Sequence, residues 1–277
     1  MQLFRYTKTI INDYLIKIIS KIINNILAIL PKRLRKEIYY QTPGSYFLSA
    51  EAKKIEKSGY LKLNLKKDAL TYNAIKKVKK ESLEIVRKLK FEDIKNKDIS
   101  KDYLKVITPF FDKKDLFLIA NDKFILQTVS SYFGFQPTIR TIDVWLNFPT
   151  KGDPKATQLF HRDYDDEKLL KLFIAISDIN TQSGPFQFIE GSHKRRSFHE
   201  FKHSKKVGRI SVELENKIIN SFPNLFTFTG KLGDGCLVNT KGLHRGLKPE
   251  KKSRIMIAIS FTSPNPNSPY VGIRDDS

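Results

Sequence analysis

Cysteine is nearly missing from this chain of 277 residues, where Cys236 is the single example. One thiol excludes an intramolecular disulfide and any zinc site built from several cysteines. It gives no sign of an oxidising compartment, so we expect a reducing, cytoplasmic location. Because free cysteine is usually buried, Cys236 is expected to be a small apolar residue of the core.

Acidic residues are also scarce, with 29 Asp and Glu against 50 Lys and Arg, for a net charge of +21. The excess lies mostly outside residues 151–200, which are electrically neutral. Such a charge suits an anionic membrane surface, an acidic substrate or nucleic acid. The dominance of lysine over arginine favours a compositional bias instead. No nucleic-acid-binding module is recognisable, so no nucleic-acid partner is expected.

A charge-free membrane span is missing as well. Residues 9–30 are apolar enough to resemble one, but they contain Asp13, Lys17 and Lys21, which are costly at the centre of a bilayer. Apolar pairs recur in this stretch with the period of a helix. The pattern therefore predicts an amphipathic helix rather than a span.

The chain is expected to divide into an N-terminal helical extension, residues 1–44, and a main domain, residues 45–277. The basic run "PKRLRK" follows the amphipathic helix at residues 31–36. Such a helix can lie on an anionic membrane surface through residues 9–36, pack on its own domain or form a dimer contact. Peripheral membrane contact and the oligomeric state therefore stay open.

Within the main domain, helical patterns come first and strand patterns follow. Ser49 and Gly59 are expected to begin and end one helix, and Gly134 to end another. The predicted helices cover residues 50–58, 74–90 and 123–134. The predicted strands cover residues 60–65, 137–148, 169–179, 186–190, 235–240 and 254–261. This order predicts a mainly β fold with flanking helices, as an antiparallel sandwich or barrel.

The stretch "QLFHRDYDD" places two potential metal ligands on one strand face. His161 and Asp163 are two residues apart, so their side chains project to the same side. Burying an imidazole beside an ionised carboxylate is costly unless a cation compensates. A second histidine, His244, ends another strand-like run. Two imidazoles and one carboxylate form the ligand set of non-haem Fe(II) oxygenases.

Arg254 lies ten residues beyond His244, at the start of the last predicted strand. The connection "GLKPEKKS" is rich in turn residues, which predicts a hairpin between the two strands. A guanidinium at that position could bind a carboxylate bidentately. A metal with open positions and an arginine within reach would suit 2-oxoglutarate.

At this point the chain resembles the phytanoyl-CoA dioxygenase family of Fe(II)- and 2-oxoglutarate-dependent oxygenases. The similarity covers about residues 45–262 and rests on "AKKIEKSGYLKL", "FHRD", "SGPFQFIEGSHKRR" and "GDGCLVNTKGLHRGLKP", followed by "SRIMIAISF". The resemblance implies a double-stranded β-helix, or jelly-roll, of the cupin type. It also implies Fe(II) held by His161, Asp163 and His244, and 2-oxoglutarate held by Arg254.

Two positions depart from the family pattern. Glu190 stands where proline is frequent, and Gly246 stands where a hydroxyl residue often helps to bind the co-substrate. Asn239, Thr240 and Asn147 are candidates for the missing contact. Because Asp163 is present, the resemblance implies hydroxylation rather than halogenation.

The other histidines are not expected to bind metal. His193 falls in the "GSHK" loop, which is structural in the family, and His199 and His203 lie in a polar stretch without an HExxH pattern. Residues 165–167, all acidic, are expected to form a solvated loop. Trp145 and Phe173 are expected in the core rather than in a pocket wall.

The sequence thus predicts an iron- and 2-oxoglutarate-dependent hydroxylase of a small, acyl-linked or lipid-linked metabolite. The basic surface favours an anionic substrate. The alternative is a catalytically inactive, membrane-peripheral binding protein of the same fold. A nucleic-acid demethylase is disfavoured, because no second arginine follows Arg254 within its strand.

Overall fold

The computed structural model describes residues 48–88, 104–107, 113–194, 219–220 and 224–263. All of them belong to one compact unit, Phe47–Ser277. The expected extension over residues 1–44, with its membrane contact, lies outside the described residues. None of the helices in the described ranges is long and apolar enough to cross a membrane.

Helices precede most of the strands along the described chain, as the sequence predicts. The helices are α3 (Ala50–Ser58), α4 (Ala69–Lys88), α6 (Lys113–Ala120) and α7 (Lys123–Phe133). The strands are β1 (Tyr60–Asn64), β2 (Leu104–Val106), β3 (Thr138–Asn147), β4 (Leu169–Ala175), β5 (Phe186–Ile189), β6 (Leu225–Phe228), β7 (Asp234–Val238), β8 (His244–Gly246) and β9 (Arg254–Thr262). Short 3-10 turns are η1 (Leu65–Lys67), η3 (Ala156–Gln158) and η4 (Thr181–Ser183).

The helix ends follow from capping residues that the sequence displays. The Ser49 side chain accepts a hydrogen bond from the Ala52 amide and begins α3, while Gly59 ends it with a φ of 91°. Asp122 caps α7 in the same way, and Gly134 ends it with a φ of 81°. Only glycine adopts this left-handed conformation without strain, so both helices end where predicted.

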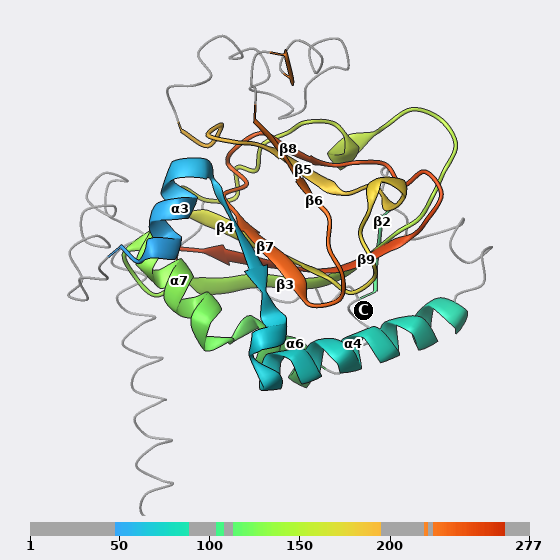
Figure 1. Cartoon of the computed structure of the whole chain (residues 1–277), viewed down its shortest axis with the longest axis horizontal. Coiled ribbons are helices and arrows are strands. Elements are labelled where there is room, and N and C mark those ends of the chain that lie inside the picture. The colour runs from blue at the N-terminus through green and yellow to red at the C-terminus, as the bar shows by residue number, and fades with distance from the viewer. Residues whose placement is uncertain (1–47, 89–103, 108–112, 195–218, 221–223, 264–277) are drawn as a thin grey trace, which may run out of the picture. The chain divides into compact units, whose positions relative to one another are not determined.

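Two antiparallel sheets face each other and form the body of the domain. The larger has the strand order β1-β7-β4-β9-β3-β2, and the smaller has the order β6-β5-β8. Helices α4, α6 and α7 cover the outer face of the larger sheet, and the smaller sheet lies over its inner face (Figure 1). The prediction of a mainly β, jelly-roll-like fold with flanking helices is confirmed.

The strands β3, β4, β7 and β9 of the larger sheet divide their side chains between two cores. In β9, Ile255, Ile257 and Ile259 pack under the helices, whereas Met256 and Ala258 point between the sheets. The same alternation runs through β3, β4 and β7, because successive side chains of a strand point to opposite faces. In β4 and β9 the side chains that face the helices are all apolar. The inner side therefore holds the polar groups described below.

The predicted hairpin between the strands of His244 and Arg254 is wrong. β8 pairs with β5 in the smaller sheet, whereas β9 lies between β3 and β4 in the larger one. The turn-rich connection "GLKPEKKS" crosses from one sheet to the other instead of reversing within one. His244 and Arg254 consequently reach the interior from opposite walls.

Candidate active site

A short antiparallel bridge brings His161 and His244 together. The amide of His161 donates to the carbonyl oxygen of His244 at 2.9 Å, and the reverse bond is 3.0 Å long. The two imidazole rings lie 4.2 Å apart between centroids. Segments separated by more than eighty residues are thus joined at the two histidines themselves.

Backbone carbonyl groups orient both imidazoles. Nδ1 of His161 lies 2.9 Å from the carbonyl oxygen of Leu159, and Nδ1 of His244 lies 2.9 Å from that of Gly242. A carbonyl oxygen only accepts hydrogen bonds, so each Nδ1 carries the proton and each Nε2 presents a lone pair. This is the usual arrangement of metal-binding histidines.

Asp163 completes the group. Its Oδ1 lies 4.0 Å from Nε2 of His161, and its Oδ2 lies 3.6 Å from Nε2 of His244. The ligand atoms of the three residues all lie within 4.8 Å of one another. Oδ2 of Asp163 is buried, and the Lys171 ammonium lies 2.7 Å from it. Two imidazole nitrogens and a carboxylate oxygen that converge in this way fit a divalent transition metal.

The electrostatic environment favours the protonation states that a metal requires. Burial and the neighbouring imidazole of His161 lower the pKa of His244 to about 3. Burial would raise the pKa of Asp163, but the Lys171 ammonium and the two imidazoles outweigh it and hold this pKa well below its usual range. At neutral pH His244 is therefore neutral and Asp163 is ionised, as ligands must be.

Lys171 is a member of the site that the sequence reasoning missed. Its Nζ lies 2.7 Å from Oδ2 of Asp163 and 3.8 Å from Oδ2 of Asp165. It belongs to β4, where Leu170 and Leu172 point to the helices, so Lys171 must point inward. A single charge inside the apolar run "LLKLFIAI" was the signal that could have revealed it.

Arg254 lies at the other end of the same cavity and is 4% exposed. Its Nε and Nη2 donate to Oδ1 of Asn147 at 3.3 and 2.9 Å, while its buried Nη1 has no hydrogen-bond partner. Burial lowers the pKa of Arg254 to about 10. No ion pair to this guanidinium is found among the described residues. An unneutralised buried cation with a spare donor is suited to an incoming carboxylate.

The guanidinium of Arg254, a residue of the larger sheet, lies beside Gly246 of the smaller sheet. A Cβ atom at this position would lie 3.2 Å from Nη2 of Arg254. The space that a side chain would fill at Gly246 is thus taken by the guanidinium. The absence of a side chain at Gly246 leaves room for Arg254, whose guanidinium donates to Oδ1 of Asn147.

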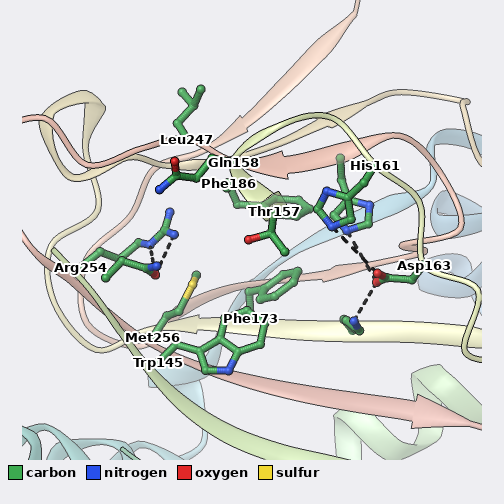
Figure 2. A pocket seen from close by; sticks show the side chains of 14 residues that line it. Trp145, Thr157, Gln158, His161, Asp163, Phe173, Phe186, Leu247, Arg254 and Met256 are labelled. Atoms are coloured by element: carbon green, nitrogen blue, oxygen red, sulfur yellow. Dashed lines mark hydrogen bonds and ion pairs between the residues drawn. The ribbon is translucent and has the colours of Figure 1, made fainter. Parts of the chain in front are cut away.

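The cavity that joins these groups has a volume of about 210 Å³. Figure 2 shows His161 and Asp163 at one end of the cavity and Arg254 at the other, with Trp145 and Phe173 below. Trp145 and Phe173, expected in the core, both line this cavity, and both also pack in the core between the sheets, where Trp145 is only partly buried. The full lining is Trp145, Asn147, Thr157, Gln158, His161, Asp163, Lys171, Phe173, Phe186, His244, Gly246, Leu247, Arg254 and Met256.

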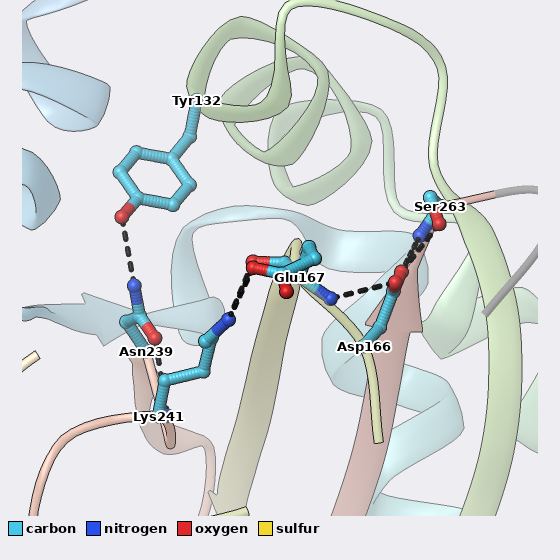
Figure 3. A network of polar contacts seen from close by, with 6 residues as sticks. All are labelled: Tyr132, Asp166, Glu167, Asn239, Lys241 and Ser263. Atoms are coloured by element: carbon cyan, nitrogen blue, oxygen red, sulfur yellow. Dashed lines mark hydrogen bonds and ion pairs between the residues drawn. The ribbon is translucent and has the colours of Figure 1, made fainter. Parts of the chain in front are cut away.

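Of the three candidates for an extra co-substrate contact, the structure places only Asn147 in the cavity lining. Asn239 belongs to a polar network outside it, where its Nδ2 donates to the Tyr132 hydroxyl at 2.9 Å (Figure 3). Thr240 accepts a hydrogen bond from the Asp163 amide through its carbonyl oxygen, at 3.0 Å. Thr240 therefore supports the backbone at Asp163, whereas Asn239 contacts Tyr132 and Lys241.

The expectation of a solvated acidic loop at residues 165–167 is wrong for Asp166. This side chain is 4% exposed, and its Oδ2 accepts hydrogen bonds from the amide and the hydroxyl of Ser263 (Figure 3). Its Oδ1 accepts from the Glu167 amide. Asp166 thus connects the loop after Asp163 to the residue that follows β9.

The remaining histidines lie away from the cavity or outside the described residues. His193 follows β5, and its Nε2 lies 3.0 Å from the carbonyl oxygen of Glu56, as expected of a structural loop residue. His199 and His203 are outside the described ranges. Cys236 is fully buried between the sheets, which confirms its expected role in the core.

No family model matches the chain. No curated protein sequence matches it either. Its similarity to known proteins therefore rests on structure.

Solved structures share the fold over most of the chain. EctD from S. alaskensis, crystallised with bound Fe, has a TM-score of 0.55 and 15% identity, covering 80% of this chain and 79% of its own. AviO1 from Streptomyces viridochromogenes Tue57 has a TM-score of 0.54 and 13% identity, covering 81% of this chain and 99% of its own. The epimerase SnoN, in complex with Fe3+, alpha ketoglutarate and nogalamycin RO, has a TM-score of 0.55 and 13% identity, with coverage of 78% and 83%. At this level of identity the likeness shows the fold alone.

Proposed function

We propose that the chain is an Fe(II)- and 2-oxoglutarate-dependent dioxygenase that hydroxylates a small, acyl-linked or lipid-linked metabolite, in the manner of the phytanoyl-CoA dioxygenase family. One observation carries the proposal: His161, Asp163 and His244 converge in the cavity that also holds the unneutralised Arg254. Structural neighbours with iron or alpha ketoglutarate in their crystals support it.

The residues present fit the group that this function requires. Two neutral imidazoles and one carboxylate would hold the iron and leave other coordination positions open. Iron and 2-oxoglutarate, when bound, supply the oxidising chemistry, in which dioxygen is consumed and succinate and CO2 are co-products. The protein's own groups determine which molecules reach that chemistry and how they are oriented.

Arg254 is assigned to the distal carboxylate of 2-oxoglutarate. Nη1 of Arg254 is buried without a partner, and Asn147 already fixes the guanidinium through Nε and Nη2. A carboxylate at Nη1 would satisfy the last donor and neutralise the charge. Met256 and Trp145 line the cavity nearby and keep water away from the pair.

The substrate is assigned to the part of the cavity mouth near η3. Thr157 and Gln158 line the cavity from that turn, opposite the aromatic floor of Phe173. The cavity volume of about 210 Å³ is smaller than that of most pockets that bind drug-sized ligands, so the co-substrate would fill much of it. The bulk of a larger substrate would therefore remain outside, with only the reacting carbon near the metal ligands.

Succinate formation tests the proposal. The protein, loaded anaerobically with Fe(II) and 2-oxoglutarate, should develop a weak visible absorption band, and a screen of acyl-linked and anionic metabolites should reveal one that stimulates succinate release. Asp163→Ala should abolish both signals. Full turnover in that variant would refute the ligand assignment, and loss of the band in the wild type would favour a non-catalytic binding protein.

A further inference from the structure

Lys171 places a second cation on the carboxylate that the metal needs. Its Nζ is 2.7 Å from Oδ2 of Asp163, the same oxygen that lies 3.6 Å from Nε2 of His244. Of the two carboxylate oxygens, the ammonium thus contacts the one nearest the imidazole of His244.

The fold restricts the movement of the Lys171 side chain away from Asp163. It sits within β4, paired to Val238 on one side and to Ser260 on the other, and its side chain is 16% exposed. Its stem is held between the sheets, so the ammonium stays close to Asp163. Asp165 at 3.8 Å and the more distant Asp143 also attract it.

We propose that Lys171 is a built-in cation that competes with the metal for Asp163, so that the empty site is charge-balanced and the metal binds more weakly than to the same ligands alone. This inference rests on the proposed metal site. The physical reason is that two cations share one carboxylate, and each lowers the affinity of that carboxylate for the other. The ammonium thereby makes the metal-free site stable at the expense of metal affinity.

The proposal has the opposite sign to a purely orienting role. A hydrogen-bond donor that merely fixed Asp163 would strengthen metal binding, and its loss would weaken binding by roughly 10–100-fold. A competing cation predicts that its removal tightens binding. Coupling energies of close charge pairs start at about 1.5 kcal/mol, which corresponds to roughly tenfold in affinity.

The test is a titration of the metal-free full chain with Co(II), followed by calorimetry and visible absorption at pH 7.5. Lys171→Met removes the charge and keeps most of the stem, and Lys171→Gln removes the charge but keeps a hydrogen-bond donor. Both should bind Co(II) roughly tenfold or more tightly than the wild type. Lys171→Arg, which keeps the charge, should bind within about threefold of the wild type.

Thermal unfolding provides the second readout. Without metal, Lys171→Gln should melt below the wild type, because Asp163 is left buried and unpaired, and Co(II) should raise its melting temperature by more than that of the wild type. Equal or weaker Co(II) binding by both neutral variants would overturn the competition. If the wild type bound no Co(II) at all, the metal site itself would fail instead. His244→Ala, which lacks a ligand, supplies the baseline for both outcomes.

Discussion

The unneutralised guanidinium of Arg254 should make this protein less stable than it could be. A fall in its pKa from 12.5 to about 10 by burial corresponds to about 3 kcal/mol of unfavourable free energy for keeping the charge in the fold. Replacing Arg254 with methionine removes this cost but deprives Asn147 of a partner, which costs about 1–2 kcal/mol. The net effect of Arg254→Met should be a stabilisation of about 1–2 kcal/mol.

Thermal unfolding of the ligand-free protein measures this gain. For a domain of this size it should appear as a rise of about 2–8 °C in the melting temperature of Arg254→Met. In the presence of Co(II), 2-oxoglutarate at a hundred times its Kd should stabilise the wild type by about 2.7 kcal/mol and raise its melting temperature. In Arg254→Met, 2-oxoglutarate should give no stabilisation beyond that of Co(II) alone. Stability and co-substrate binding would thus move in opposite directions.

Asn147→Asp is the matched variant, because it offers the same guanidinium a carboxylate within the chain. It should also stabilise the ligand-free protein, and it should weaken 2-oxoglutarate binding by occupying Arg254. The reasoning is refuted if Arg254→Met lowers the melting temperature of the ligand-free protein and still responds to 2-oxoglutarate.

Three further expectations concern the residues around the site. Asp166→Ala should lose about 2–3 kcal/mol of unfolding free energy in urea titration, because the Ser263 amide loses its buried acceptor. Glu167→Ala should lose less than about 1 kcal/mol, because its ion pair with Lys241 is half exposed. Equal losses in the two variants would contradict the structural role of Asp166. Gly242→Ala would place a Cβ 2.6 Å from the Phe188 ring and from Ser192 Oγ, so it should cost about 1–3 kcal/mol of unfolding free energy. The shift of the backbone next to His244 should also weaken Co(II) binding. Unchanged Co(II) affinity in calorimetry would contradict this effect on His244. Burial raises the pKa of the Cys236 thiol well above its ordinary value, so a thiol reagent at pH 8 should label the folded chain only at the rate of unfolding, and prompt labelling in native buffer would count against this burial.

Local patterns were sufficient for most of the fold. The caps at Ser49, Gly59 and Gly134 and the runs of β-branched residues predicted the major helices and strands, because these signals act within a few residues. The short β2, β6 and α6 were not anticipated, since each carries too few residues for a periodic pattern. The N-terminal extension over residues 1–44 stays a prediction.

The site was harder to predict than the fold wherever it depends on long-range pairing. The spacing of His161 and Asp163 and the isolated His244 were readable, and the structure brings them together. The partner strand of β8 was predicted wrongly because a turn-rich connection does not encode which sheet follows it. Lys171 was overlooked because a single lysine gives no signal until it is known which side chains of β4 face the space between the sheets.

The alternation of side chains in β4 and β9 also makes the fold sensitive to the register of these strands. Every second side chain of the two strands packs in the apolar core beneath the helices, and the intervening ones include Arg254 and Lys171. Slippage by one position would push two charges into that layer and turn isoleucines toward the metal ligands. A sheet in the wrong register would therefore lose its apolar core and the arrangement of the cavity residues at the same time.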